Sequence, residues 1–139
     1  MTFDRVVLAL NAAFVFVTGI GCIVVPASVA QQAGLSMAPS ALTEIRAFYG
    51  GILVGTGCFL VWCLRRPTRT FAGLLMVLLT VGGAGMARIL GMLIDRAPTA
   101  YHLTNLGVEI TTVTLVAVAI TRARPVADAE VASPAISRR

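Results

Sequence analysis

The sequence predicts an all-α membrane protein, a bundle of four transmembrane helices with both termini on the cytoplasmic side. Of the 139 residues, 58% are hydrophobic and only 12% are charged, and the mean hydropathy is +0.90. A soluble domain of this length exposes too much of its surface to water to hide so many apolar side chains. Apolar stretches of about 20 residues instead match the thickness of a bilayer.

Four segments have this length, and spans are expected at about residues 6–25, 41–64, 70–94 and 99–120. Helices are the natural form, because backbone groups within lipid must hydrogen-bond inside their own segment. Residues 1–121 then form one transmembrane domain. Residues 122–139, rich in Ala, Pro, Ser and charge, are expected to form a mobile cytoplasmic tail.

An alternative for the first span is a cleaved signal peptide covering residues 1–30. Ser28-Val29-Ala30 is similar to a signal-peptidase cleavage site. The apolar run before it is, however, longer than the roughly 7–15 residues usual in signal peptides. We therefore expect the first helix to be retained.

The orientation follows from the arginines, which supply all the basic charge. Arginines stand at the N-terminus, in the turn after the second span and after the fourth span, at positions 5, 65, 66, 69, 122, 124, 138 and 139. Membrane proteins keep such residues on the cytoplasmic side. Both termini are therefore expected in the cytoplasm of a bacterium, with the protein in the inner membrane. Because the arginines lie at helix ends and not on one soluble face, nucleic acid is not an expected partner.

The three cysteines, Cys22, Cys58 and Cys63, all lie within apolar segments. Their number is odd and no C-x-x-C is present, so neither a disulfide framework nor a redox pair is expected. They are interpreted as small apolar side chains.

Polar residues inside the spans mark a candidate site. Charged groups at mid-helix cost about 2.5–3.5 kcal/mol on insertion, so they usually face the bundle interior and pair. On the fourth span, His102, Asn105 and Glu109 are spaced by three and four residues and form one stripe. The candidate residues for a ligand site or an ion-pair network are Glu44, Arg46, Tyr49, Arg88, His102, Asn105 and Glu109. They lie in the external half or the centre of their spans, which predicts a polar external chamber above an apolar floor.

Glycines accompany these charges. Gly51 and Gly55 form a small-x-x-x-small pattern, and Gly85 and Gly91 share the face of Arg88. Small residues let membrane helices approach closely. Gly50, Gly51, Gly55, Gly85 and Gly91 are therefore predicted to be helix-packing positions.

Three interpretations of the polar residues stay open. One is an ion-pair network that fixes helix register, in which Arg88 or Arg46 holds Glu109 bidentately. The second, our functional hypothesis, is a binding or accessory protein whose pocket takes a small ligand, a lipid headgroup or a partner helix. The third is a proton-coupled transporter or channel component that uses Glu109.

Catalytic residues, metal and cofactor are not expected. The sequence lacks nucleophile-elbow, P-loop and zinc-helix motifs. His102 and Glu109 alone are too few to hold a metal ion. The expected partners are the lipid bilayer, a small ligand or lipid, and a second copy or another membrane protein.

Two short motifs resemble a known family. E-I-R-A-F-Y-G-G at residues 44–51 and A-R-I-L-G-M at residues 87–92, with Glu109, resemble a domain-of-unknown-function family of small bacterial four-helix membrane proteins. The resemblance implies four spans. It also implies a shared polar site that includes Glu44, Arg46, Tyr49, Arg88 and Gly91, and it implies no activity.

Overall fold

The computed structural model describes residues 2–132, and the side chains of residues 2–122. This part of the chain is helical apart from its connections and contains no strand. The elements in order are α1 (Phe3–Val24), α2 (Pro26–Gln32), α3 (Pro39–Glu44), the π-helix η1 (Ile45–Gly51), α4 (Ile52–Leu64), the 3₁₀-helix η2 (Pro67–Arg69), α5 (Thr70–Asp95) and α6 (Ala100–Ala132).

Four helices among the described residues are long and apolar enough to cross a membrane, judged by length and composition. They are Phe3–Val24, Pro39–Leu64, Pro67–Asp95 and Ala100–Arg122. The second is a single continuous helix made of α3, η1 and α4. The predicted all-α class with four long apolar segments is thereby confirmed.

The fourth helix is longer than predicted. It was expected to end near residue 120, but α6 continues through Pro125 to Ala132. The first part of the predicted tail, 122–139, is therefore helical. Residues 133–139 lie outside the described residues, and the mobility of the tail stays a prediction.

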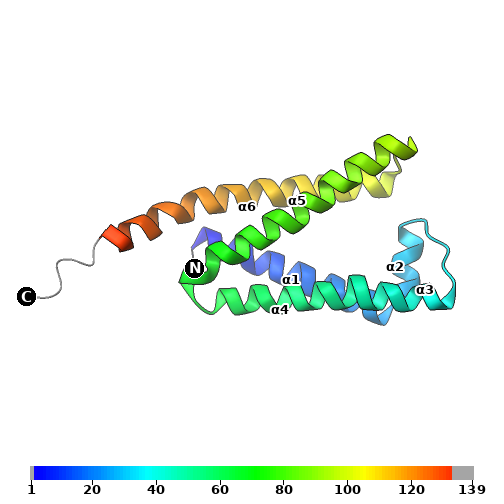
Figure 1. Ribbon diagram of the computed structural model, residues 1–139, viewed down its shortest axis with the longest axis horizontal. Coiled ribbons are helices and arrows are strands. Elements are labelled where there is room, and N and C mark those ends of the chain that lie inside the picture. Colours follow the sequence, from blue (N-terminus) through cyan, green and yellow to red (C-terminus); the bar gives the residue numbers. More distant parts are fainter. Residues whose placement is uncertain (1, 133–139) are drawn as a thin grey trace, which may run out of the picture.

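The helices form two antiparallel hairpins (Figure 1). In the first, α1 packs along η1 and α4; in the second, α5 packs along α6. The hairpins meet at the end that holds the N-terminus and the α4–α5 turn, here called the closed end, and they diverge toward α2 and α3, here called the open end (Figure 1). The four helices thus pack together as a bundle only at the closed end.

The position of the core explains this shape. The main cluster of buried apolar side chains joins all four long helices near the closed end: Val7, Leu8, Ala12, Leu60, Cys63, Leu74, Val77, Val116, Ala119 and Ile120. A smaller cluster of Cys22, Ala30 and Ile45 joins α1, α2 and η1 at the open end. It includes no residue of α5 or α6. Apolar packing therefore holds the two hairpins together at one end only.

Glycines set the close approach within the first hairpin. A Cβ on Gly50 would overlap the Ile23 side chain and lie 3.3 Å from the Gly19 carbonyl oxygen. A Cβ on Gly19 would lie 2.8 Å from the backbone nitrogen of Val54. The backbones of α1 and η1–α4 are consequently in direct contact here.

Gly51 and Gly55 of the same segment lie differently. A Cβ on Gly51 would meet only the Arg46 carbonyl of its own helix, at 3.9 Å, and one on Gly55 would meet nothing within 4 Å. The face predicted from the Gly51–Gly55 spacing therefore contacts no other helix in the described part of the chain.

Candidate functional site

An ion pair joins α5 to α6 in the half of the second hairpin that lies away from the closed end. Arg88 Nε donates to Glu109 Oε2 at 3.0 Å, and Arg88 Nη2 donates to Glu109 Oε1 at 2.8 Å. The two side chains are only 23% and 12% exposed. This bidentate geometry is the strongest that arginine and carboxylate can make. Of the two arginines predicted as partners of Glu109, the structure selects Arg88.

A glycine makes room for this pair. A Cβ on Gly85, one turn before Arg88 on α5, would lie 3.4 Å from Glu109 Oε2 and 3.6 Å from its Cβ. The missing side chain lets α6 place its carboxylate directly against the α5 backbone. Gly91, by contrast, faces open space, with nothing within 4 Å of a Cβ built there.

Next to the ion pair lies a polar hollow, hereafter the α5–α6 hollow, of about 190 Å³. It is lined by Arg88, Gly91, Met92, Asp95, Ala97 and His102. Four of these residues come from α5 at spacings of three, four and seven, so they share one helix face. The hollow thus combines a guanidinium, a carboxylate and an imidazole. Two larger hollows of about 430 and 360 Å³, on residues 27–42 and 48–53, contain no charged side chain.

The start of α6 positions His102. Thr99 precedes the helix, and its Oγ1 accepts a hydrogen bond from the backbone N–H of His102 at 3.3 Å, as an N-cap does. The imidazole lies edge-on to Tyr101, with ring centroids 5.7 Å apart. His102 Nδ1 is buried and has no hydrogen-bond partner within the described residues. A buried polar atom normally has a partner, so this nitrogen is an exception beside the hollow.

Arg46 lies on the other hairpin and has a different role. Its Nε donates to the carbonyl oxygen of Ile23 at 3.2 Å, near the C-terminus of α1. The last carbonyls of a helix lack intrahelical partners and carry partial negative charge, so a cation there is favourable. Arg46 therefore stabilises the end of α1 and makes no contact with Glu109.

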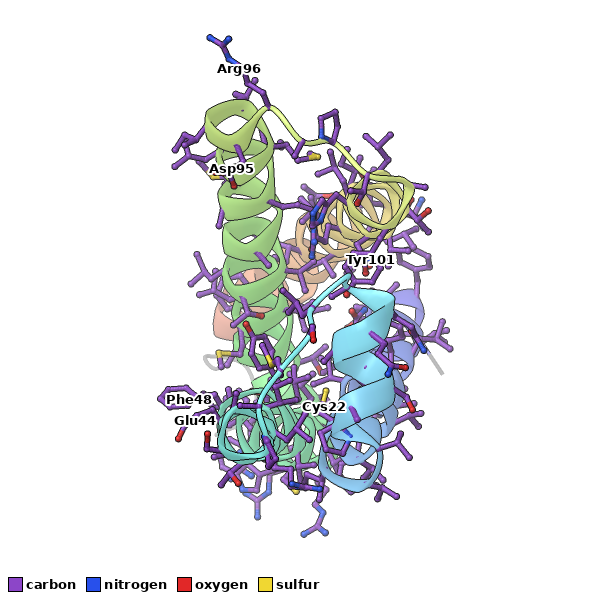
Figure 2. All side chains as sticks on the ribbon, turned by 90° about the vertical axis from the view of Figure 1, so that its right-hand side faces the viewer. Cys22, Glu44, Phe48, Asp95, Arg96 and Tyr101 are labelled. Carbon is purple, nitrogen blue, oxygen red and sulfur yellow. The ribbon has the colours of Figure 1, made fainter. Side chains whose placement is uncertain are left out.

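Glu44 and Tyr49 also stay apart from the ion pair. Both side chains are exposed, and Tyr49 lines an apolar hollow with Phe48, Ile52 and Leu53. Figure 2 shows Glu44 and Phe48 on the same side of their helix. Asn105 is satisfied within α6, since its Nδ2 donates to the Tyr101 carbonyl at 2.8 Å. Of the seven predicted site residues, the structure therefore brings Arg88, His102 and Glu109 together on the second hairpin.

Asp95 is the lining residue that the sequence argument left out of the site. It belongs to the same α5 face as Arg88, seven residues further on, and this spacing was the available signal. It makes no ion pair with any side chain that the structure describes. Its neighbour Arg96 points away from α6 at the tip of α5 (Figure 2).

The described residues contain no group of three or more His, Cys, Asp or Glu side chains that could hold a metal ion. The α5–α6 hollow itself is lined by hydrogen-bonding and charged groups: the Arg88 guanidinium, the His102 imidazole and the Asp95 carboxylate, which is unpaired within this part of the chain.

Fold and site together define an all-α protein of four long apolar helices with an interhelical ion pair beside a polar hollow. The chain belongs to the family described as Domain of unknown function (DUF4345), whose pattern matches residues 3–120. The match extends from α1 into α6 and confirms the resemblance to an uncharacterised family. No curated protein and no solved structure matches the chain.

Proposed function

We propose that this protein is a small integral membrane protein that binds a lipid headgroup or another small polar ligand in the α5–α6 hollow. The proposal places the four apolar helices across a bacterial inner membrane, with both termini in the cytoplasm and the open end on the external side. The single observation that carries the binding role is the polar hollow itself, in which the carboxylate of Asp95, unpaired among the described side chains, lies with Arg88 and His102.

The size and place of the hollow fit a headgroup. Pockets for drug-sized ligands measure about 300–1,000 Å³, whereas this hollow measures about 190 Å³. It lies where α5 ends and α6 begins, so in a bilayer it would lie toward the interface, where headgroups are found. A lipid could then leave its chains in the hydrocarbon and place only its polar end in the protein.

The Arg88–Glu109 pair supports the hollow structurally. It neutralises both charges and holds α5 against α6 in a region away from the apolar core. The same contact therefore fixes the register of the two helices and supports the proposed binding site. Proton-coupled transport through Glu109 is less well supported. Both oxygens of that carboxylate already accept hydrogen bonds from arginine, which remains charged at all accessible pH values.

Filling the hollow without breaking the ion pair tests the proposal. A Cβ at Gly91 meets no atom within 4 Å, so Gly91→Leu extends a side chain into the hollow; Gly83, on the same helix outside the hollow, is equally open at Cβ, and Gly83→Leu serves as the control. Both variants and the wild type would be purified from membranes, and their retained lipids and metabolites compared by mass spectrometry. Loss of a retained molecule in Gly91→Leu alone, with thermal stability unchanged, is the expected result; equal content in all three would contradict binding.

A further inference from the structure

The α5–α6 hollow has an uncompensated charge. Glu109 neutralises Arg88, whereas Asp95 has no ion-pair partner among the described side chains. With His102 neutral, the charges of Arg88, Glu109 and Asp95 sum to −1. A purely anionic ligand would therefore meet a site of its own sign, and a ligand that brings a cation would be favoured.

The remaining hydrogen-bonding groups are of both kinds. Nε and Nη2 of Arg88 are used by Glu109, while its Nη1 makes no hydrogen bond within the described residues and remains a donor for an anion such as a phosphate oxygen. The Asp95 carboxylate has no ion-pair partner among the described side chains and can only accept. The hollow thus offers a donor for a phosphate and an acceptor for an ammonium group.

We propose that the hollow recognises the phosphoethanolamine headgroup of an aminophospholipid, an inference that rests on the proposed function. The phosphate oxygen accepts from Arg88 Nη1. The primary ammonium donates to the Asp95 carboxylate.

This chemistry discriminates among headgroups. A choline headgroup carries the same charge but has no N–H, so it cannot donate to Asp95, and its three methyl groups enlarge the cation. A glycerol headgroup keeps the phosphate but brings no cation for Asp95. The hollow also lacks the aromatic cage by which proteins usually bind quaternary ammonium. The affinity is expected to be higher for the ethanolamine headgroup than for either the choline or the glycerol headgroup.

The test uses the full chain in detergent, titrated with short-chain phosphatidylethanolamine, phosphatidylcholine and phosphatidylglycerol and followed by native mass spectrometry. For the wild type we expect at least tenfold tighter binding of phosphatidylethanolamine than of either other lipid. Asp95→Asn, which keeps the shape and removes the charge, is expected to reduce this preference to within about threefold. Arg96→Asn is the matched control, because it removes a neighbouring charge that points away from α6 and asparagine tolerates the positive φ of 51° at that position.

The outcomes separate the two proposals. Equal affinity for ethanolamine and choline lipids, or an unchanged preference in Asp95→Asn, would overturn the ammonium assignment and leave headgroup binding intact. Tighter binding of phosphatidylglycerol would show an anion site and also overturn it. If Gly91→Leu binds all three lipids as the wild type does, the α5–α6 hollow is not the binding site and the proposed function itself fails.

Discussion

At the residue scale, the Arg88–Glu109 pair explains how a strongly apolar chain tolerates two charges in the interior of long apolar helices. A carboxylate or guanidinium alone there would cost several kcal/mol, and pairing with short bidentate hydrogen bonds offsets much of this. Because the pair is nearly buried, removing one partner leaves the other charge uncompensated. The two residues should therefore behave as one unit in mutagenesis.

A double-mutant cycle tests this coupling. Arg88→Ala and Glu109→Gln are each expected to lower the free energy of unfolding by about 3 kcal/mol, because each leaves a buried group without its partner. The double variant is expected to lose clearly less than the sum of the two. Unfolding in mixed micelles, followed by circular dichroism, measures the three changes. Additive losses would show that the pair contributes no coupling energy.

Sequence reasoning reached the members of this pair but not their pairing. Spacing placed His102, Asn105 and Glu109 on one stripe, and the cost of buried charge predicted a partner for Glu109. Which arginine would serve was open, because Arg46 and Arg88 lie on different helices and spacing along one helix carries no information about the distance to another. The structure settles it through the close contact of α5 with α6 at Gly85.

At the element scale, the unusual feature is the π-helix η1, IRAFYGG at Ile45–Gly51. It covers most of the E-I-R-A-F-Y-G-G motif. π-helical turns are rare and frequently occur at functional positions. Here η1 places Arg46 at the carbonyl end of α1 and Gly50 against Ile23. The motif thus docks the second long helix on the first.

The sequence predicted Gly50 as a packing position, but the π-helical turn could not be derived from it, because face assignments assumed 3.6 residues per turn throughout. With that period, Gly51 and Gly55 were also expected to pack against another helix. In the structure the close contact is made by Gly50, while Gly55 faces open space. The turn between the second and third long helices was easier to predict, since Arg65-Arg66-Pro67 marks it chemically, whereas α6 runs past its predicted end near residue 120.

Alanine substitutions distinguish the two glycines. Gly50→Ala is expected to destabilise the protein by about 2 kcal/mol, because its methyl group overlaps Ile23 and crowds the α1 backbone. Gly55→Ala is expected to be neutral or to stabilise by up to about 1 kcal/mol, since alanine favours helix and the site is open. Thermal melts in one detergent compare them. A larger loss for Gly55→Ala would indicate that the open face packs against another chain.

At the scale of the whole molecule, positive charge and apolar packing are concentrated at the same end. The closed end contains the shared core together with the arginines near the N-terminus, in the α4–α5 turn and late in α6: Arg5, Arg65, Arg66, Arg69 and Arg122. Several of these are fixed in place: Arg5 Nη2 donates to the Leu64 carbonyl at 2.7 Å, and the guanidinium of Arg69 stacks 3.8 Å from the centre of the Trp62 ring. Arginine and tryptophan together are typical of a membrane interface.

The antiparallel order of the four long helices places the N-terminus, the 65–69 turn and the end of α6 on one side of the molecule and the α2–α3 connection on the other (Figure 1). The orientation proposed for the membrane follows if the arginine-rich closed end stays in the cytoplasm. Cysteines introduced one at a time at Thr68 and Ser36 report the two sides, in a background in which the exposed Cys58 is replaced by alanine and the buried Cys22 and Cys63 remain. A membrane-impermeant maleimide is expected to label Ser36→Cys in intact cells and Thr68→Cys only after permeabilisation. The opposite pattern would invert the molecule and place the α5–α6 hollow at the cytoplasmic interface, while labelling of both positions from one side would contradict a four-span arrangement.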